Sequence, residues 1–216
     1  ERISDTIRQE ALEKAAELIR AAKKPYIMVG GGASISGASA ELKEFVDKVD
    51  APVCDTLMGK GAYDGREANY TGMLGMHGTK TSNFGVSRCD LLIAVGTRFS
   101  DRILGDAKKF AAQAKILQLD VDPAEINKNV VVTSEVIGDI KEILKRLTPM
   151  LEPMDHREWK EEIAELSMKY PMSYNDEGLS GPFVVEELYR QTGGDATVVT
   201  EVGQHQMWAA QYYRYK

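Results

Sequence analysis

The sequence has few cysteines, few histidines and no long apolar run. Only two of its 216 residues are cysteine, Cys54 and Cys89, and both lie among apolar neighbours without Cys-x-x-Cys spacing. This usage excludes a disulfide scaffold and a zinc module, and it is typical of reduced core residues in a cytoplasmic protein. The three histidines, His77, His156 and His205, are far apart and lack metal-ligand spacing. We therefore predict no metal site within the chain.

The chain also lacks a basic patch and a membrane-spanning pattern. No apolar stretch approaches the ~20 residues that a transmembrane helix needs, and no signal-peptide pattern is present. Basic residues number 27 and acidic residues 33, giving a net charge of −6, and the longest basic cluster is a pair. We expect neither nucleic acid nor a membrane among the partners, because both are bound through basic surfaces. The first residue, Glu1, predicts excision from a longer protein.

Helical and strand patterns alternate over the first 150 residues. Helices are expected over 3–22, 38–49, 79–88 and 140–150, with a glycine-rich stretch over 57–75 and a polar loop over 97–106. Strands are expected over 26–29, 52–56, 90–96 and 115–123, and the segments 130–132 and 135–139 supply a further strand region. Short apolar runs that end in glycine are typical of buried parallel strands. The pattern predicts an α/β fold with an open, doubly wound, mostly parallel sheet of six strands.

The pattern changes after residue 150, where prolines become frequent. We predict a central domain over 1–150, a linker over 151–180 with an exposed connecting helix at 159–170, and the truncated start of a further α/β domain over 181–216. That last segment is expected to hold a helix over 183–191, a strand over 196–200 and a helix from 204 onward.

Candidate ligand contacts follow the strands, because open parallel sheets bind ligands at the carboxyl ends of their strands. The residues there are Gly30, Gly31, Gly32, Thr56, Leu57, Gly96, Thr97, Arg98, Asp120, Val121, Gly138 and Asp139. The glycines suit either a phosphate or the turn geometry alone, and Ile35 breaks the G-x-G-x-x-G pattern. Asp120 and Asp139 are suited either to accept a hydrogen bond from a ribose hydroxyl or to cap a helix. Arg98 and Arg102 suit a pyrophosphate, a carboxylate or a solvated loop.

Five stretches together carry a more specific resemblance. They are 29–32, 57–61, 73–78 (Met-Leu-Gly-Met-His-Gly), 94–102 and 202–211, which contains Gly-Gln-His-Gln-Met-Trp-Ala. With them the chain resembles the catalytic subunit of acetohydroxyacid synthases, also called acetolactate synthases, over nearly its whole length. These thiamine-diphosphate enzymes act in branched-chain amino acid biosynthesis, and their central domain binds FAD.

The resemblance implies a set of cofactor and substrate contacts. The expected FAD contacts are Gly30, Gly31, Gly32, Thr56, Leu57, Leu74, Met76, His77, Gly96, Arg98, Arg102, Asp120, Val121 and Asp139. Arg102 is expected to bind the carboxylate of the incoming 2-oxoacid, with Met76 and Asp101 nearby as further catalytic residues. Ser100 stands where the family often has aspartate, so this contact loses a carboxylate.

The resemblance also implies thiamine diphosphate and Mg²⁺ in the full-length enzyme. Gly203, Gln204 and His205 match the diphosphate-side contacts, whereas in the family the activating glutamate lies upstream and the magnesium-binding Gly-Asp-Gly segment downstream of this chain. The implied substrates are pyruvate and 2-oxobutyrate, and the implied assembly is a cytoplasmic homo-oligomer with a possible regulatory small subunit. We expect the 216-residue chain alone to be inactive.

Three other interpretations compete with this one. A pyruvate oxidase or a glyoxylate carboligase shares the central fold, but the string at 73–78 and Arg102 speak against it. A sirtuin-type deacylase requires a zinc-binding Cys-x-x-Cys pair that the sequence lacks. A non-catalytic nucleotide-binding module is the third alternative.

Overall fold

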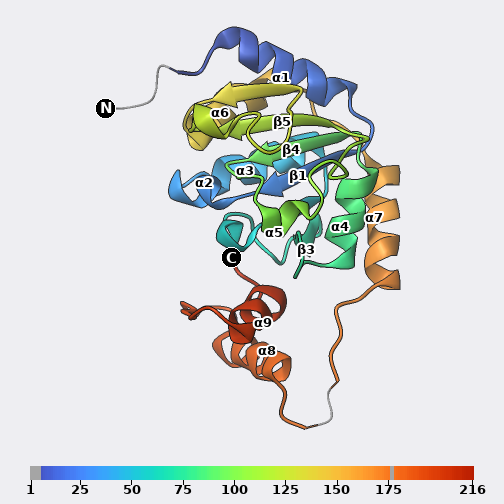
Figure 1. Cartoon of the computed structure of the whole chain (residues 1–216), viewed down its shortest axis with the longest axis vertical. Helices are drawn as coiled ribbons and strands as arrows, with labels where there is room; N and C mark the ends of the chain where they lie inside the picture. Colours follow the sequence, from blue (N-terminus) through green and yellow to red (C-terminus); the bar gives the residue numbers. More distant parts are fainter. Residues whose placement is uncertain (1–5, 176–177) are drawn as a thin grey trace.

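The computed structural model describes residues 6–175 and 178–216 (Figure 1). Six strands alternate with helices and 3-10 turns along the chain. The strands are β1 (Pro25–Val29), β2 (Val53–Asp55), β3 (Tyr70–Met73), β4 (Leu91–Val95), β5 (Lys115–Asp120) and β6 (Ser134–Ile137). The helices are α1 (Gln9–Ala21), α2 (Gly31–Ile35), α3 (Ser39–Val49), α4 (Lys80–Arg88), α5 (Asp101–Leu104), α6 (Ile140–Leu147), α7 (Arg157–Lys169), α8 (Gly181–Thr192) and α9 (Gln204–Tyr212), and the 3-10 turns are η2 (Leu57–Gly59), η3 (Pro123–Glu125) and η4 (Thr148–Met150).

All six strands run parallel in the order β3-β2-β1-β4-β5-β6. The chain builds outward from β1 in one direction to β3 and then returns to pair β4 with the other edge of β1. This is the strand order of doubly wound dinucleotide-binding sheets, with its switch point between β1 and β4. The predicted fold class, a six-stranded open parallel sheet, is confirmed.

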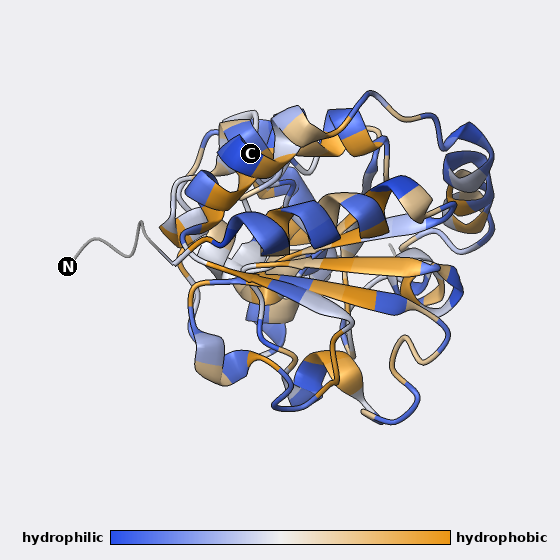
Figure 2. Cartoon of the chain, turned by 90° about the horizontal axis from the view of Figure 1, so that it is seen from above, coloured by the Kyte–Doolittle hydropathy of each residue, from blue (hydrophilic) through white to orange (hydrophobic). Residues whose placement is uncertain are grey.

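Two hydrophobic cores cover the two faces of the sheet, because successive strand residues point to opposite faces. On β1, Ile27 and Val29 join α1, α3 and α6 in one core, while Tyr26 and Met28 join α4 and α7 in the other. Figure 2 shows the strands mostly in the hydrophobic colour, with hydrophilic residues on the outer sides of the helices. Covering both faces is what makes β1 and β4 apolar along their whole length.

Several helices begin at a polar cap that the sequence supplies. Asp139 Oδ1 accepts the Glu142 N–H at 3.1 Å at the start of α6. Thr79 Oγ1 accepts the Ser82 N–H at 3.0 Å at the start of α4, so this helix starts one residue later than predicted. Such caps satisfy backbone donors that the first helical turn leaves without an acceptor. Residues 6–8 of the predicted helix 3–22 are not helical, so α1 begins at Gln9, and residues 3–5 of that prediction lie outside the described residues.

The strand predictions are wrong at three places. β3 lies within the glycine-rich stretch 57–75, where no strand was predicted. It was missed because the polar and small residues of Tyr70–Met73 form no apolar run. Residues 130–132 form no strand, and Val131 is 81 % exposed, so the predicted region 130–139 reduces to β6. Residues 196–200 are also irregular, because within the described residues no neighbouring strand pairs with them. The polar loop 97–106 contains the short helix α5.

The helix α7 is a covering helix of the sheet, so the prediction of an exposed connecting helix is wrong. Trp159, Ile163 and Leu166 are buried and pack in the same core as Tyr26. The indole Nε1 of Trp159 donates a hydrogen bond to the Pro25 carbonyl at 2.9 Å. The apolar stripe of α7 is therefore fixed on the start of β1.

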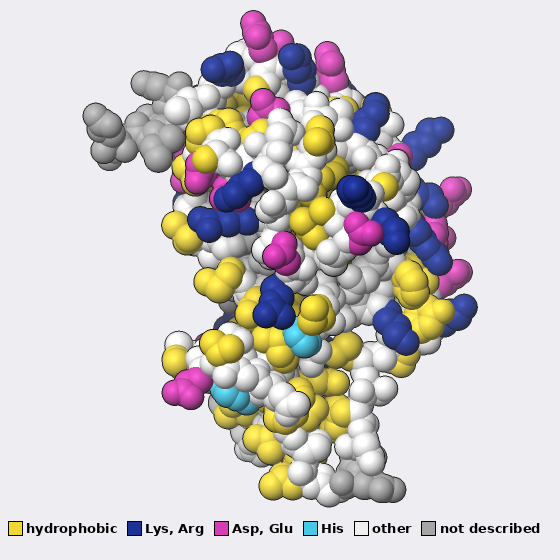
Figure 3. Space-filling model, viewed as in Figure 1, with side chains coloured by type: hydrophobic (Ala, Val, Ile, Leu, Met, Phe, Trp, Pro, Cys, Tyr) yellow, Lys and Arg dark blue, Asp and Glu magenta, His cyan; other side chains and the backbone are white. Residues whose placement is uncertain are grey.

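The C-terminal segment forms a helical pair at one end of the molecule (Figure 1). α8 and α9 pack together, and α9 also touches β3. Figure 3 shows basic and acidic side chains interspersed over the sheet, with hydrophobic side chains more prominent around α8 and α9. Among the described residues, no helix is long and apolar enough to cross a membrane. Cys54 and Cys89 are buried free thiols, as predicted.

Candidate functional site

The switch point of the sheet is built from glycines of two turns. A Cβ on Gly30 would lie 2.4 Å from the Gly96 carbonyl oxygen, and one on Gly32 would lie 2.8 Å from Gly96 Cα. The N–H of Gly30 donates to Val95 at 2.9 Å, and that of Gly32 to Gly96 at 2.9 Å. Gly96 has a φ of +59°, which glycine adopts at no steric cost. These glycines therefore join the turn after β1 to the turn after β4.

The turn after β2 packs beside these glycines. Thr56 Oγ1 accepts the Gly59 N–H at 3.2 Å and so caps η2, in which Leu57 is half-buried. Gly59 lies so close to β1 that a Cβ would stand 2.3 Å from the Val29 carbonyl oxygen. The Met58 side chain is 75 % exposed. This turn presents an apolar side chain to solvent at the carboxyl edge of the sheet.

The structure brings together the three residues predicted to be catalytic. Gly75, with a φ of +101°, lies against the backbone of α5, and the Met76 N–H donates to the Arg102 carbonyl at 3.1 Å. Asp101 and Arg102 are exposed on α5, and Met76 is 68 % exposed. The backbones of the three residues are thus held next to one another, and their exposed side chains supply a guanidinium, a carboxylate and a thioether. Such groups can bind a small molecule with a carboxylate and a short apolar part.

The remaining predicted contacts lie along the same edge of the sheet. Asp120, 6 % exposed at the end of β5, already accepts hydrogen bonds from the Asp122 N–H at 3.0 Å and the Gln118 amide at 3.4 Å. Its neighbour Val121 is 42 % exposed. Asp139 caps α6. Of the two roles that the sequence offered for this residue, the helix cap is therefore present in the structure. Arg98 reaches solvent, and its guanidinium stands 4.0 Å from Glu125.

The residues predicted to contact thiamine diphosphate lie on another element. Gly203 precedes α9, and Gln204 and His205 form its exposed first turn. The far end of α9 is tied to the sheet domain, because the Gln211 amide donates to the His77 carbonyl at 2.8 Å. One helix therefore links the segment 203–205 to the loop that carries Met76.

Sequence analysis missed a buried ionic network at the end of β2. Asp55 is 2 % exposed, its Oδ1 stands 3.0 Å from the Lys60 ammonium nitrogen, and its Oδ2 accepts the Tyr70 hydroxyl at 2.9 Å. Lys60 also donates to the Tyr70 hydroxyl at 2.6 Å. Burial raises the pKa of the Asp55 carboxyl, and Lys60 and Tyr70 partly offset this increase. The sequence does hold a signal for this network, because Asp55 ends a buried strand and Lys60 follows it five residues later.

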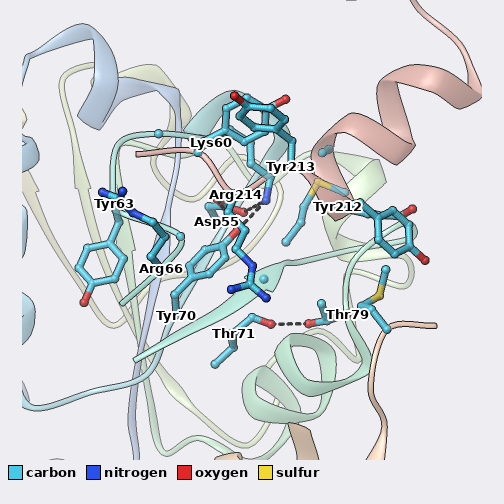
Figure 4. A pocket seen from close by; sticks show the side chains of 18 of the residues that line it. Asp55, Lys60, Tyr63, Arg66, Tyr70, Thr71, Thr79, Tyr212, Tyr213 and Arg214 are labelled. Carbon is cyan, nitrogen blue, oxygen red and sulfur yellow. Dashed lines mark hydrogen bonds and ion pairs between the residues drawn. The ribbon is translucent and has the colours of Figure 1, made fainter. Parts of the chain in front are cut away.

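The network forms the floor of a cavity of about 450 Å³ between the β2–β3 edge and α9 (Figure 4). Of the predicted contacts only His77 lines it. The predicted FAD contacts otherwise lie on the open carboxyl edge of the sheet. Within residues 6–175 and 178–216, no group of three or more His, Cys, Asp or Glu side chains is placed to hold a metal ion.

Comparison with known proteins gives a consistent result. Residues 12–147 match the family model described as "Thiamine pyrophosphate enzyme, central domain". Over 95 % of its length, the chain is 42 % identical to a probable acetolactate synthase large subunit of Methanocaldococcus jannaschii, and covers 36 % of that protein. Over 95 % of its length the chain is also 42 % identical to the chloroplastic acetolactate synthase 2 of Nicotiana tabacum, of which it covers 32 %. Over the same fraction of its length it is 41 % identical to the acetolactate synthase of Mycobacterium bovis, of which it covers 35 %.

The chain thus spans about a third of the length of these relatives. The family model covers β1 to β6 together with the switch point, which are the parts that build the carboxyl edge. The match therefore assigns this sheet to thiamine-dependent enzymes and not to the sirtuin type. The chain belongs to the thiamine pyrophosphate enzyme family and contains its central domain.

Proposed function

We propose that the chain is the central part of an acetolactate synthase catalytic subunit, a transferase that condenses two 2-oxoacids with loss of carbon dioxide. The observation that carries this proposal is the 40–42 % identity to acetolactate synthases from an archaeon, a plant and a bacterium over nearly all of the chain. The substrates are pyruvate and 2-oxobutyrate, and the pathway is branched-chain amino acid biosynthesis. The chain includes residues 1–150 as the central domain, 151–180 as a linker and 181–216 as the start of a further domain.

The carboxyl edge of the sheet suits an FAD molecule by the chemistry of its groups. Arg98 and Arg102 are exposed guanidiniums that suit a pyrophosphate, and the buried Asp120 carboxylate keeps free lone pairs for a ribose hydroxyl. Met58, Met76 and Val121 are 75 %, 68 % and 42 % exposed, which gives the edge apolar surface for a planar ring. The other predicted FAD contacts would complete this edge from the neighbouring turns. FAD, when bound, would serve as a structural group, because the condensation needs no net redox step.

The chain's own residues would bind and orient the 2-oxoacid. The Arg102 guanidinium matches a carboxylate in its bidentate geometry, and the backbone bond from Met76 to Arg102 fixes the two residues relative to each other. Met76 would contact the short apolar part of the substrate, and Asp101 would orient Arg102. Holding the reactant in one orientation lowers the entropic barrier of the condensation.

The thiamine side would be completed by other parts of the parent enzyme. Thiamine diphosphate and Mg²⁺ would supply the thiazolium carbanion and the electron sink for decarboxylation when bound. Gly203, Gln204 and His205 would contact its diphosphate from the start of α9. We further propose a cytoplasmic homo-oligomer with a possible regulatory small subunit. Because the activating glutamate and the magnesium-binding segment would come from outside the chain, residues 1–216 alone should produce no acetolactate.

A flavin titration tests the cofactor edge directly. FAD is added to the purified chain, and flavin fluorescence and absorbance are recorded. We expect a saturable change that weakens about tenfold or more in Arg98→Met, since a charged hydrogen bond is lost. Arg157→Met is the matched control, because Arg157 pairs with Asp155 at the start of α7. An absent flavin signal, or equal affinity in both variants, contradicts this assignment.

A further inference from the structure

The cavity between the β2–β3 edge and α9 is a candidate ligand site separate from the carboxyl edge. Its volume of about 450 Å³ lies within the range of pockets for small molecules. Aromatic rings provide much of its wall, namely Tyr63, Tyr70, Tyr212, Tyr213 and Tyr215. Such rings offer flat apolar surface and hydroxyl groups to a planar ligand.

Most charged groups around this cavity already have a partner. Arg66 makes a bidentate pair with Asp64, and Glu67 lies 3.5 Å from Lys43. Glu186 accepts a hydrogen bond from the Tyr174 hydroxyl at 2.6 Å. These groups therefore add no free cation to the site.

Two cationic side chains retain donors for a ligand. Lys60 is only 12 % exposed, and its ammonium uses two directions, toward Asp55 and toward Tyr70, so one of its three N–H groups remains. Arg214 extends from the C-terminal segment into the cavity beside Tyr70 and Thr71 (Figure 4). Within the described part of the chain, no carboxylate lies in ion-pair range of Arg214. A guanidinium without an acid partner is matched by a carboxylate in charge and in geometry.

We propose that this cavity binds a small monocarboxylate with a planar apolar body. Arg214 holds the carboxylate, Lys60 supplies a further donor, and the tyrosine rings contact the body of the ligand. Glu186 at the cavity wall repels anions, and it repels a dianion such as phosphate more strongly than a monoanion. Apart from His77, none of the residues proposed to contact FAD, thiamine diphosphate or the 2-oxoacid lines this cavity.

Titration calorimetry of the 216-residue chain tests the proposal with three probes: benzoate, benzyl alcohol and inorganic phosphate. We expect saturable binding of benzoate and much weaker binding of the other two. Arg214→Met should weaken benzoate about tenfold or more, because a charged hydrogen-bond donor is lost. Arg190→Met is the matched control, since Arg190 is an exposed α8 residue paired with Glu187 and does not line the cavity.

The role of Lys60 needs a variant that keeps the network neutral. Lys60→Met alone leaves Asp55 buried without its cation, so the double variant Lys60→Met with Asp55→Asn is used, and it should also weaken benzoate severalfold. The proposal is overturned if benzoate does not bind, if benzyl alcohol or phosphate binds as tightly, or if Arg214→Met binds benzoate like the wild type. None of these outcomes depends on whether the chain binds FAD.

Discussion

Replacing Lys60 with methionine removes the cation that balances the buried Asp55 carboxylate. Removing one partner of a buried ion pair costs about 3–5 kcal/mol, because the other charge stays buried. The variant can instead protonate Asp55, which from an unfolded pKa of about 3.9 costs ~4 kcal/mol at about pH 7. The wild type already carries part of this cost, because burial raises the pKa of Asp55 there as well. We therefore expect the free energy of unfolding to fall by up to ~4 kcal/mol, a large part of the 5–15 kcal/mol typical of a domain.

The pH dependence of this loss is the specific signature. Burial already raises the pKa of Asp55 in the wild type, and loss of Lys60 raises it further. A carboxyl whose folded pKa exceeds its unfolded pKa destabilises the fold at high pH, and the penalty fades as the pH falls towards the unfolded pKa. The relevant pH range lies between the folded-state pKa of Asp55 in the wild type and that in the variant. Within this range, the difference in the free energy of unfolding between the two proteins should narrow by ~1.4 kcal/mol for each pH unit of acidification.

Urea unfolding followed by circular dichroism measures this gap at about pH 7.5 and about pH 5.5. Lys43→Met is the control, because its pair with Asp47 is exposed and should contribute under ~1 kcal/mol. Adding Asp55→Asn to Lys60→Met should recover much of the lost stability, since the amide carries no charge. An equal gap at both pH values, or a loss below ~1 kcal/mol at the higher pH, refutes the reasoning.

Two further predictions concern the packing around the sheet, and thermal denaturation checks both. Trp159→Phe keeps an aromatic ring but removes the donor to the Pro25 carbonyl, so it should lower the free energy of unfolding by about 1–3 kcal/mol. Met168→Ala, on the exposed side of α7, is the control and should be nearly neutral. Equal effects of the two variants would contradict the anchoring role of Trp159. Gly30→Ala places a Cβ 2.4 Å from the Gly96 carbonyl oxygen and should cost about 1–3 kcal/mol, against little change for the exposed Ser34→Ala. A Gly30→Ala variant as stable as the wild type would show that the two turns can move apart.

The sequence predicted the elements whose residues are buried on both sides. β1 and β4 are apolar runs because helices cover both faces of the sheet, and this pattern can be read from the sequence without knowledge of the neighbouring elements. The starts of α4 and α6 were predicted within one residue, since the caps Thr79 and Asp139 act on the next turn of the same segment. The Met76–Arg102 group was placed by resemblance to a family, and neither residue's pattern alone pointed to the other.

Only the tertiary structure decided the features that depend on distant partners. β3 is a strand because β2 offers it an edge, although its residues predicted none. The run at 196–200, which was predicted as a strand, finds no edge among the described residues. Trp159 is buried because the start of β1 lies opposite α7, and Asp55 tolerates burial because the chain returns Lys60 and Tyr70 to it. Short-range patterns record which faces are apolar, but hydrogen-bond partners and counter-charges come from segments that the fold alone brings into contact.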